Sequence, residues 1–92
     1  MEIDLRQIET SYELHRILKE KLCFPNFYGM NWDAFWDAIT GLVELPSKIV
    51  FVGWERMREI LPEDSEICKN LFEEYNKRYG IPFNNYCEIV YS

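Results

Sequence analysis

The stretch Ile49-Val50-Phe51-Val52 is an unbroken run of β-branched and aromatic residues near the middle of the chain. A run of this kind is typical of a strand that is covered on both faces in a parallel sheet. Shorter strands are predicted near both ends of the chain, from Ile3 to Leu5 and from Cys87 to Tyr91. The fold therefore depends on how three strands are connected.

Two helices are predicted between the first and second strands. Thr10 and Glu13 have the spacing of a capping box, which predicts that the first helix begins after Thr10. Its apolar residues recur on one face, at Leu14, Ile17, Leu18 and Leu22. Residues 24–30 contain proline, glycine and three aromatic residues, so we expect an aromatic loop between the two helices.

The second helix is predicted to begin after Asn31, a favourable N-cap residue, and to run to Thr40. It stops at Gly41, which suits the left-handed position that follows many helices. Its residues at core spacing are Trp32, Phe35 and Ile39.

The connection between the second and third strands also predicts two helices. A short one is marked by Trp54, Met57, Ile60 and Leu61, and it ends by Pro62. A longer one runs from about Glu63 to Tyr79. Its inward residues are predicted to be Ile67, Leu71, Phe72, Tyr75 and Tyr79. Helices between successive strands require crossover connections. We therefore expect one α/β domain over residues 1–92, with a small three-stranded parallel sheet and about four helices.

The composition limits the classes of partner. The chain has 92 residues, with 10 basic and 16 acidic side chains and a formal net charge of -6. This charge argues against direct binding to nucleic acid and favours a basic partner. No apolar run approaches the roughly 20 residues that span a bilayer, and residues 1–4 do not resemble a signal peptide. We expect a soluble, cytoplasmic protein that does not bind membranes.

The cysteines and the single histidine give no signal for catalysis or metal binding. Cys23, Cys68 and Cys87 are far apart and form no C-x-x-C motif, so we expect reduced and mostly buried thiols rather than a disulfide or a zinc site. His15 has no nucleophile motif nearby, and we expect it at the surface or only partly packed.

The charge pattern is unusual around the second helix. No Lys or Arg occurs from Cys23 to Ser47. Asp33 and Asp37, four residues apart, share the helix face opposite the core with Trp36 and Thr40. Neither carboxylate has a basic neighbour three or four residues away, and such a pair repels by roughly 0.2–0.5 kcal/mol. This pattern favours a preformed surface for a cationic, concave partner over a solvated helix face.

A catalytic or metal-binding use of these carboxylates is the third interpretation. Paired catalytic acids need a pocket that separates their pKa values, and so short a chain has little volume for one. Asp33 and Asp37 supply two oxygen ligands without the ligand-rich loop of a calcium site. The chain has no glycine-rich phosphate loop. We therefore expect no enzyme activity, no metal and no cofactor.

The stretch from Phe24 to Pro46 resembles the central motif of the barstar family of ribonuclease inhibitors. The matching residues are Pro25, Tyr28, Gly29, Asn31, Asp33, Ala34, Trp36, Asp37, Ala38, Thr40, Gly41, Val43, Glu44 and Pro46. The resemblance implies a barstar-like α/β domain and a one-to-one inhibitor of a small, basic, barnase-type ribonuclease. In such inhibitors the second helix and the loop before it plug the active site of the enzyme.

The resemblance also implies a set of partner-binding residues. Asp37 would enter the phosphate pocket of the nuclease, with Asp33 and Thr40 making polar contacts beside it. Trp36 and Gly41 would shape the surface. The complete set is Phe27, Asn31, Trp32, Asp33, Trp36, Asp37, Thr40, Gly41, Leu42 and Glu74. A carboxylate on a rigid helix can replace a phosphate because both accept hydrogen bonds from the same cationic groups.

Three residues depart from the family pattern. Phe27 stands where the family has Tyr, Trp32 where it has Leu, and Leu42 where it has Trp, so the accepted nuclease is expected to differ. Two other functions stay open at this level. The same surface would serve an immunity or regulatory protein that binds a non-ribonuclease toxin or another basic partner, and a small carboxylate-dependent hydrolase would use Asp33 for turnover.

Overall fold

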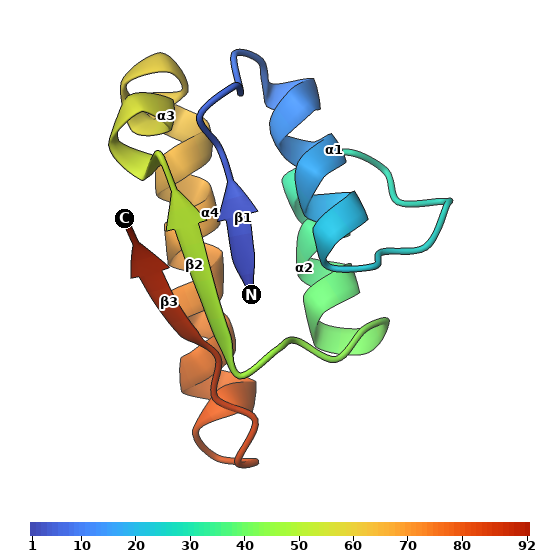
Figure 1. The fold of residues 1–92 in the computed structure, drawn as a ribbon. Helices are drawn as coiled ribbons and strands as arrows, with labels where there is room; N and C mark the ends of the chain where they lie inside the picture. The colour runs from blue at the N-terminus through green and yellow to red at the C-terminus, as the bar shows by residue number, and fades with distance from the viewer.

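A computed structural model describes all residues, 1–92, and contains the expected three-stranded parallel sheet. The strands β1 (Glu2–Asp4), β2 (Lys48–Val52) and β3 (Glu88–Tyr91) lie in the order β1-β2-β3 (Figure 1). Phe51 is in register with Ile3 on one side and with Tyr91 on the other. The predicted central strand is thus confirmed.

Four α-helices and one π-helical turn occupy the connections. They are α1 (Ser11–Lys21), α2 (Trp32–Gly41), α3 (Trp54–Ile60), α4 (Pro62–Tyr75) and the turn η1 (Asn76–Gly80), which continues directly from α4. Figure 1 shows α1 and α2 next to each other on one side of β1, with α4 running behind β2. The predicted α/β architecture is confirmed, and the π-helical turn was not predicted. None of the helices combines the length and the apolar character that a bilayer span requires.

Only one face of the sheet is fully covered. Ile49 and Phe51 of β2 are completely buried, whereas Val50 and Val52, which point the other way, are half-buried. The prediction that both faces are covered is wrong. Charged side chains lie on that second face, at Glu2 and Asp4 of β1, Lys48 of β2 and Glu88 of β3, and they keep it in contact with water.

Aromatic rings in the core connect α2 to the sheet. Phe35 of α2 packs edge-on against Phe72 of α4 at 5.4 Å between ring centroids, and Phe72 packs against Phe51 of β2 at 5.9 Å. All three side chains are fully buried in a cluster of 19 apolar residues. Because protein interiors are close-packed, this contact chain fixes the position of α2.

The helix starts are as predicted. Thr10 and Glu13 form the complete capping box, and the side chain of Asn31 accepts a hydrogen bond from the backbone N–H of Ala34 at 2.8 Å. The end of α2 is different, since Gly41 is its last residue and has no left-handed backbone. The N–H groups of the next two residues both donate to the Ala38 carbonyl, which closes the helix without a left-handed residue.

The buried face of α4 was only partly predicted. Phe72 and Tyr75 are buried and Leu71 is half-buried, but Ile67 and Tyr79 are 39% and 38% exposed. The core positions of α4 follow the spacing Ser65, Cys68, Phe72 and Tyr75, so Ile67 lies to one side. The wider π-helical turn then rotates Tyr79 away from this line.

Two of the three cysteines lie in the interior of the molecule. Cys68 and Cys87 are buried and Cys23 is exposed, so the prediction of mostly buried cysteines is confirmed, and all three thiols are free. Burial raises the pKa of Cys87 to about 11.

The prediction of a surface or partly packed His15 is wrong, because its side chain is only 2% exposed. It is enclosed by the loop before α2, which no periodicity within its own helix reveals.

Candidate functional site

The exposed face of α2 carries two carboxylates that the fold leaves without a cation. Asp33 and Asp37 are exposed, and Trp36 lies half-buried between them. The four ion pairs of the chain all lie elsewhere. They join Arg6 to Asp4, Arg56 to Glu9, Arg58 to Glu55 and Arg78 to Glu74. The predicted uncompensated pair on α2 is therefore present in the folded molecule.

The backbone of α2 holds these side chains in fixed positions. Phe35, Ala38 and Ile39 are buried on the opposite face of the helix. The hydroxyl of Thr40 donates to the carbonyl of Trp36 at 2.6 Å, so its proton is used within the helix while its oxygen can still accept. A binding surface on such a helix needs little reordering when a partner arrives.

A groove of about 570 Å³ runs between α2 on one side and α4 with η1 on the other. One wall consists of Trp32, Asp33, Trp36 and Asp37, and the other of Ile67, Leu71, Glu74 and Arg78. The structure thus brings five predicted site residues together from two helices, including Glu74. Ile67, Leu71 and Arg78 were not predicted to belong to this site. The alignment of Ile67, Leu71, Glu74 and Arg78 at helical spacing is the signal that could have found them.

The charge of Glu74 is already paired within the molecule. Its carboxylate lies 2.8 Å from Nε of Arg78, one helical turn further along. A partner cation would therefore compete with Arg78 for Glu74, whereas it meets no such competitor at Asp33 or Asp37. Glu74 thus lies beside α2, as predicted, but its charge is paired within the molecule, unlike the charges of Asp33 and Asp37.

Most contacts of the Trp32 side chain are with other parts of the molecule rather than with solvent. Its ring packs against His15 at 4.3 Å and against Phe35 at 5.2 Å between centroids. Its indole N–H donates to the carboxylate of Asp64, at the start of α4, at 2.8 Å. The core spacing predicted for Trp32 is consistent with these contacts, and only part of the half-buried ring lines the groove.

The remaining predicted residues lie outside the groove, at the ends of α2 and on the segments that flank it. Phe27, in the loop before the helix, is 76% exposed, and Leu42, just after it, is 51% exposed. Asn31 and Gly41 are exposed at the two ends of the helix, although the Asn31 side chain is engaged in capping. These four residues extend the surface beyond the two carboxylates at both ends of α2.

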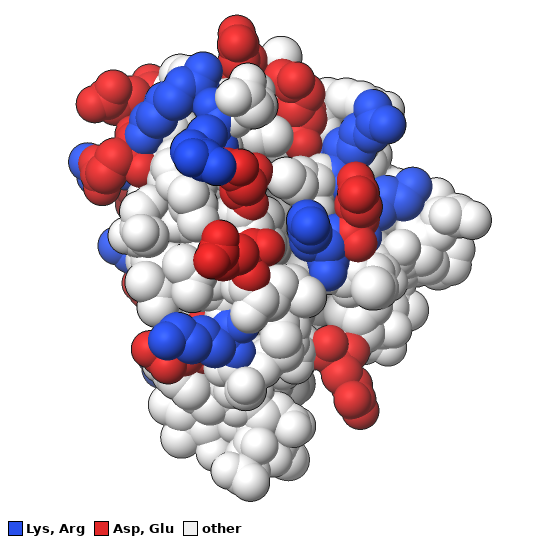
Figure 2. Space-filling view, in the orientation of Figure 1, with Lys and Arg blue, Asp and Glu red and all other residues white.

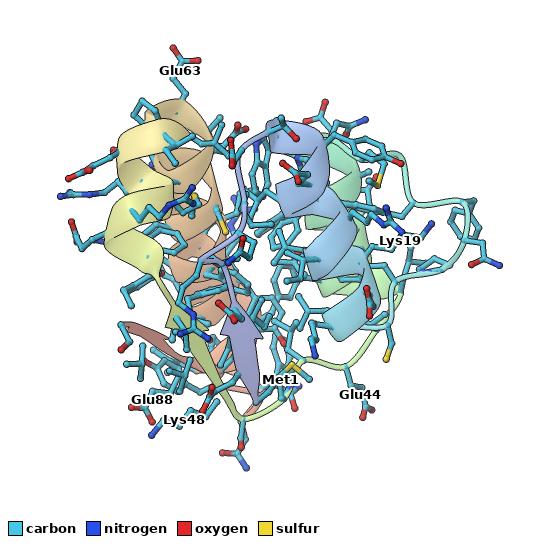
Figure 3. All side chains as sticks on the ribbon, turned by 45° about the horizontal axis from the view of Figure 1, so that its top comes forward. Met1, Lys19, Glu44, Lys48, Glu63 and Glu88 are labelled. Atoms are coloured by element: carbon cyan, nitrogen blue, oxygen red, sulfur yellow. The ribbon has the colours of Figure 1, made fainter.

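The electrostatic surroundings of this surface are asymmetric. The segment from Cys23 to Ser47 has no cation of its own, and the only side-chain hydrogen bond that it receives from a lysine joins Lys19 to the Asn26 carbonyl, at 3.3 Å. Glu44 adds an exposed carboxylate after α2 and extends away from the molecule (Figure 3). Figure 2 shows charges of both signs over the upper part of the molecule and neither sign at its lower end. No three His, Cys, Asp or Glu side chains are grouped to hold a metal ion.

Two comparisons with known proteins relate the chain to a family and to a curated protein. The family model described as barstar (barnase inhibitor) matches residues 1–88, which include all the helices and the groove. A curated protein of Bacillus subtilis (strain 168), "Putative ribonuclease inhibitor YrdF", is 49% identical over 53 residues. That alignment covers 58% of this chain and 58% of the relative. With its parallel sheet, its helix order and a family match over nearly its whole length, the chain belongs to the barstar (barnase inhibitor) family.

Proposed function

We propose that this protein is an inhibitor of a small basic ribonuclease of the barnase type, and that it binds the enzyme one-to-one through α2. The observation that carries the proposal is the exposed pair Asp33 and Asp37, for which the fold provides no cation. The family description and the printed name of the Bacillus relative support the same function.

The chemistry of the proposed complex follows from what a ribonuclease must bind. An active site that holds a phosphodiester presents cationic hydrogen-bond donors in a concave surface. Asp37, in the second turn of a helix anchored by buried side chains, offers carboxylate oxygens to those donors in place of phosphate oxygens. Asp33 and Thr40 accept further hydrogen bonds beside it. The protein acts by occupying the site and catalyses no step itself.

The surrounding residues contribute in different ways. Trp36 and Phe27 supply aromatic contact area, which interfaces favour. Glu74 contributes less than its charge suggests, because a partner cation must displace or share Arg78. The resemblance to the barstar family implies that the nuclease is secreted, and an inhibitor inside the cell would protect the cell that makes it. We therefore place the protein in the cytoplasm, where its three free cysteines stay reduced.

The test is an inhibition titration against a panel of small basic ribonucleases, with residual RNA cleavage as the readout. We expect at least one enzyme to be inhibited at a one-to-one ratio, and the chain alone to cleave no RNA. The variant Asp37→Asn should weaken inhibition at least roughly tenfold, because it removes a central charged contact. Glu59→Gln is the matched control, since Glu59 is exposed on α3 and takes part in no ion pair.

Each outcome has a definite meaning. Unchanged inhibition by Asp37→Asn would contradict the proposed mechanism. Binding to a basic protein other than a ribonuclease, lost in Asp37→Asn, would instead assign the surface to a different toxin. Turnover by the isolated chain that disappears in Asp33→Asn would identify a hydrolase.

A further inference from the structure

The segment from Tyr79 to Cys87 is an uncharged, apolar lobe at one end of the molecule. It contains no Asp, Glu, Lys or Arg. Four large apolar side chains in it are exposed, namely Tyr79, Ile81, Phe83 and Tyr86. Figure 1 places this segment at the lower end of the molecule, where Figure 2 shows no charged side chain. Contiguous apolar surface of this kind is uncommon on a monomer unless something binds there.

Hydrogen bonds hold the lobe in place. The side chain of Asn76, in η1, donates to the Cys87 carbonyl at 2.7 Å and accepts from the Cys87 N–H at 2.9 Å. The N–H of Asn85 donates to the Gly80 carbonyl at 2.7 Å. A Cβ at Gly80 would lie 2.6 Å from the Asn76 side-chain oxygen, so only glycine fits there. The apolar side chains are therefore presented by an ordered backbone, which lowers the entropic cost of binding.

The lobe continues the α2 surface. The rings of Tyr79 and Trp36 lie 6.1 Å apart between centroids. A hollow of about 510 Å³ lies between the end of α2 and the lobe, with Thr40 and Glu44 on one side and Tyr79 and Phe83 on the other. Thr40 thus belongs both to the proposed binding face of α2 and to the wall of this hollow.

The π-helical turn creates this continuity. The N–H of Ile81 donates to the carbonyl of Asn76, five residues earlier, at 2.8 Å. An uninterrupted α-helix would place Tyr79 one turn above the buried Tyr75, on the core side. The wider turn moves Tyr79 to the surface beside Trp36 instead. π-turns of this kind occur often at functional sites.

Size and charge indicate what covers the lobe. A ten-residue helix is about 15 Å long, and a standard interface buries about 800 Å² on each partner, so a partner on α2 must also contact neighbouring segments. A second copy of this chain would carry the same net charge of -6 and would be repelled, whereas a basic nuclease is attracted to the adjacent carboxylates.

We propose that the lobe, with Phe83 at its centre, is a second contact surface for the same nuclease that binds α2. This inference rests on the proposed function and adds to it a second region of contact with the nuclease. The enzyme presents an apolar loop beside its basic cleft, and that loop packs into the hollow against Tyr79 and Phe83. The acidic face of α2 then governs how fast the complex forms, and the lobe governs how long it lasts and which nuclease is accepted.

The test measures association and dissociation rates for an inhibited ribonuclease at low and high salt. Phe83→Ser and Ile81→Ser are suitable variants because these side chains are 65% and 68% exposed and support no core contact. We expect Phe83→Ser to raise the dissociation rate roughly tenfold at both salt concentrations and to leave the association rate unchanged, because apolar contacts are not screened. The control is Ile60→Ser, since Ile60 is 40% exposed on α3, at the opposite end of the molecule in Figure 1.

Two results would overturn this inference. One is a dissociation rate for Phe83→Ser and Ile81→Ser equal to that of wild type and Ile60→Ser. The other is a wild-type dimer, seen by light scattering, that Phe83→Ser dissociates without any change in nuclease affinity, because a second copy would then cover the lobe. A wild-type chain that inhibits no ribonuclease would instead contradict the proposed function, so the two failures are distinguishable.

Discussion

The ring nitrogen Nδ1 of His15 lies 2.7 Å from the hydroxyl oxygen of Tyr28 in the buried space beneath the start of α2. That hydroxyl donates to the carbonyl of Asn31, the N-cap residue, at 3.3 Å. Because a hydroxyl has only one proton, Nδ1 of His15 must be the donor to Tyr28. The ring of His15 also contacts Trp32. One buried histidine thus supports the first turn of the proposed binding helix.

Stability should decrease as the pH falls from about 6.5 towards 5. Burial lowers the pKa of His15 below its ordinary value of 6.5, and the charge of Asp64 opposes this only in part. The unfolded chain therefore takes up a proton at a higher pH than the folded one, and protonation favours unfolding. Urea unfolding at fixed ionic strength, at about pH 5.2 to about pH 7.5, measures this change in the free energy of unfolding. This range lies above the ordinary carboxyl pKa of roughly 4 and spans the ordinary histidine pKa of roughly 6.5. His15→Gln should have a flatter profile, and parallel profiles would contradict the prediction.

Tyr28→Phe should destabilise the protein by about 1–3 kcal/mol, because it leaves the Nδ1–H of the buried His15 without a partner. The free energy of unfolding in urea is the measurement. Tyr12→Phe is the matched control, since Tyr12 is 62% exposed. This control substitution should change the free energy of unfolding by no more than about 0.5 kcal/mol. Equal effects of the two substitutions would show that the hydroxyl of Tyr28 is unimportant.

Asn31→Ala should cost about 1 kcal/mol, because the N–H of Ala34 loses its capping acceptor. Asn31→Asp keeps a side-chain oxygen at the N-cap and adds a charge that the helix dipole favours, so it should cost less. Thermal or urea unfolding of both variants tests the pair. A larger loss for Asn31→Asp than for Asn31→Ala would exclude capping as the role of this side chain.

Asp37→Asn should leave the free energy of unfolding unchanged or raise it by about 0.2–0.5 kcal/mol, while it weakens inhibition. The substitution relieves repulsion from Asp33, and Asp37 has no ion pair to lose. Asp33→Asn relieves the same repulsion but gives up its favourable position in the first turn of the helix, so it should gain less. Urea unfolding compares the two, and a clear loss of stability in Asp37→Asn would contradict its assignment to binding.

Asn76→Ala should destabilise the protein by at least about 2 kcal/mol, because it removes both hydrogen bonds to the buried backbone of Cys87. Asn70→Ala is the same substitution at an exposed position of α4 and should cost far less. Urea unfolding is the measurement, and similar losses in the two variants would mean that the lobe is not anchored through Asn76.

The parts of the fold that local sequence controls were predicted well. The capping box at Thr10 and the N-cap at Asn31 involve residues within one helical turn, so their spacing is sufficient. The acidic face of α2 follows from the same periodicity. The site is less local, since the spacing of Ile67, Leu71, Glu74 and Arg78 defines one face of a helix but does not show that this face lies beside α2.

Errors arose where burial depends on a neighbouring segment or on a change of helix type. His15 is buried because the loop with Tyr28 closes over α1. Tyr79 is exposed because a π-helical turn interrupts the regular spacing of α4. Neither cause appears in the periodicity of the helix concerned, since periodicity describes a face but not what covers it.

The sequence by itself determined the order of the elements, the helix starts and an acidic helix face without nearby cations, because these depend on residues at most a few positions apart. Only the tertiary structure decided that Arg56 pairs with the distant Glu9, that Glu74 and Arg78 line a groove with Asp33 and Asp37, and that Tyr79 lies beside Trp36. The physical reason is that the interactions available to a charged or apolar side chain at the surface depend on which distant groups the fold places within a few ångströms of it.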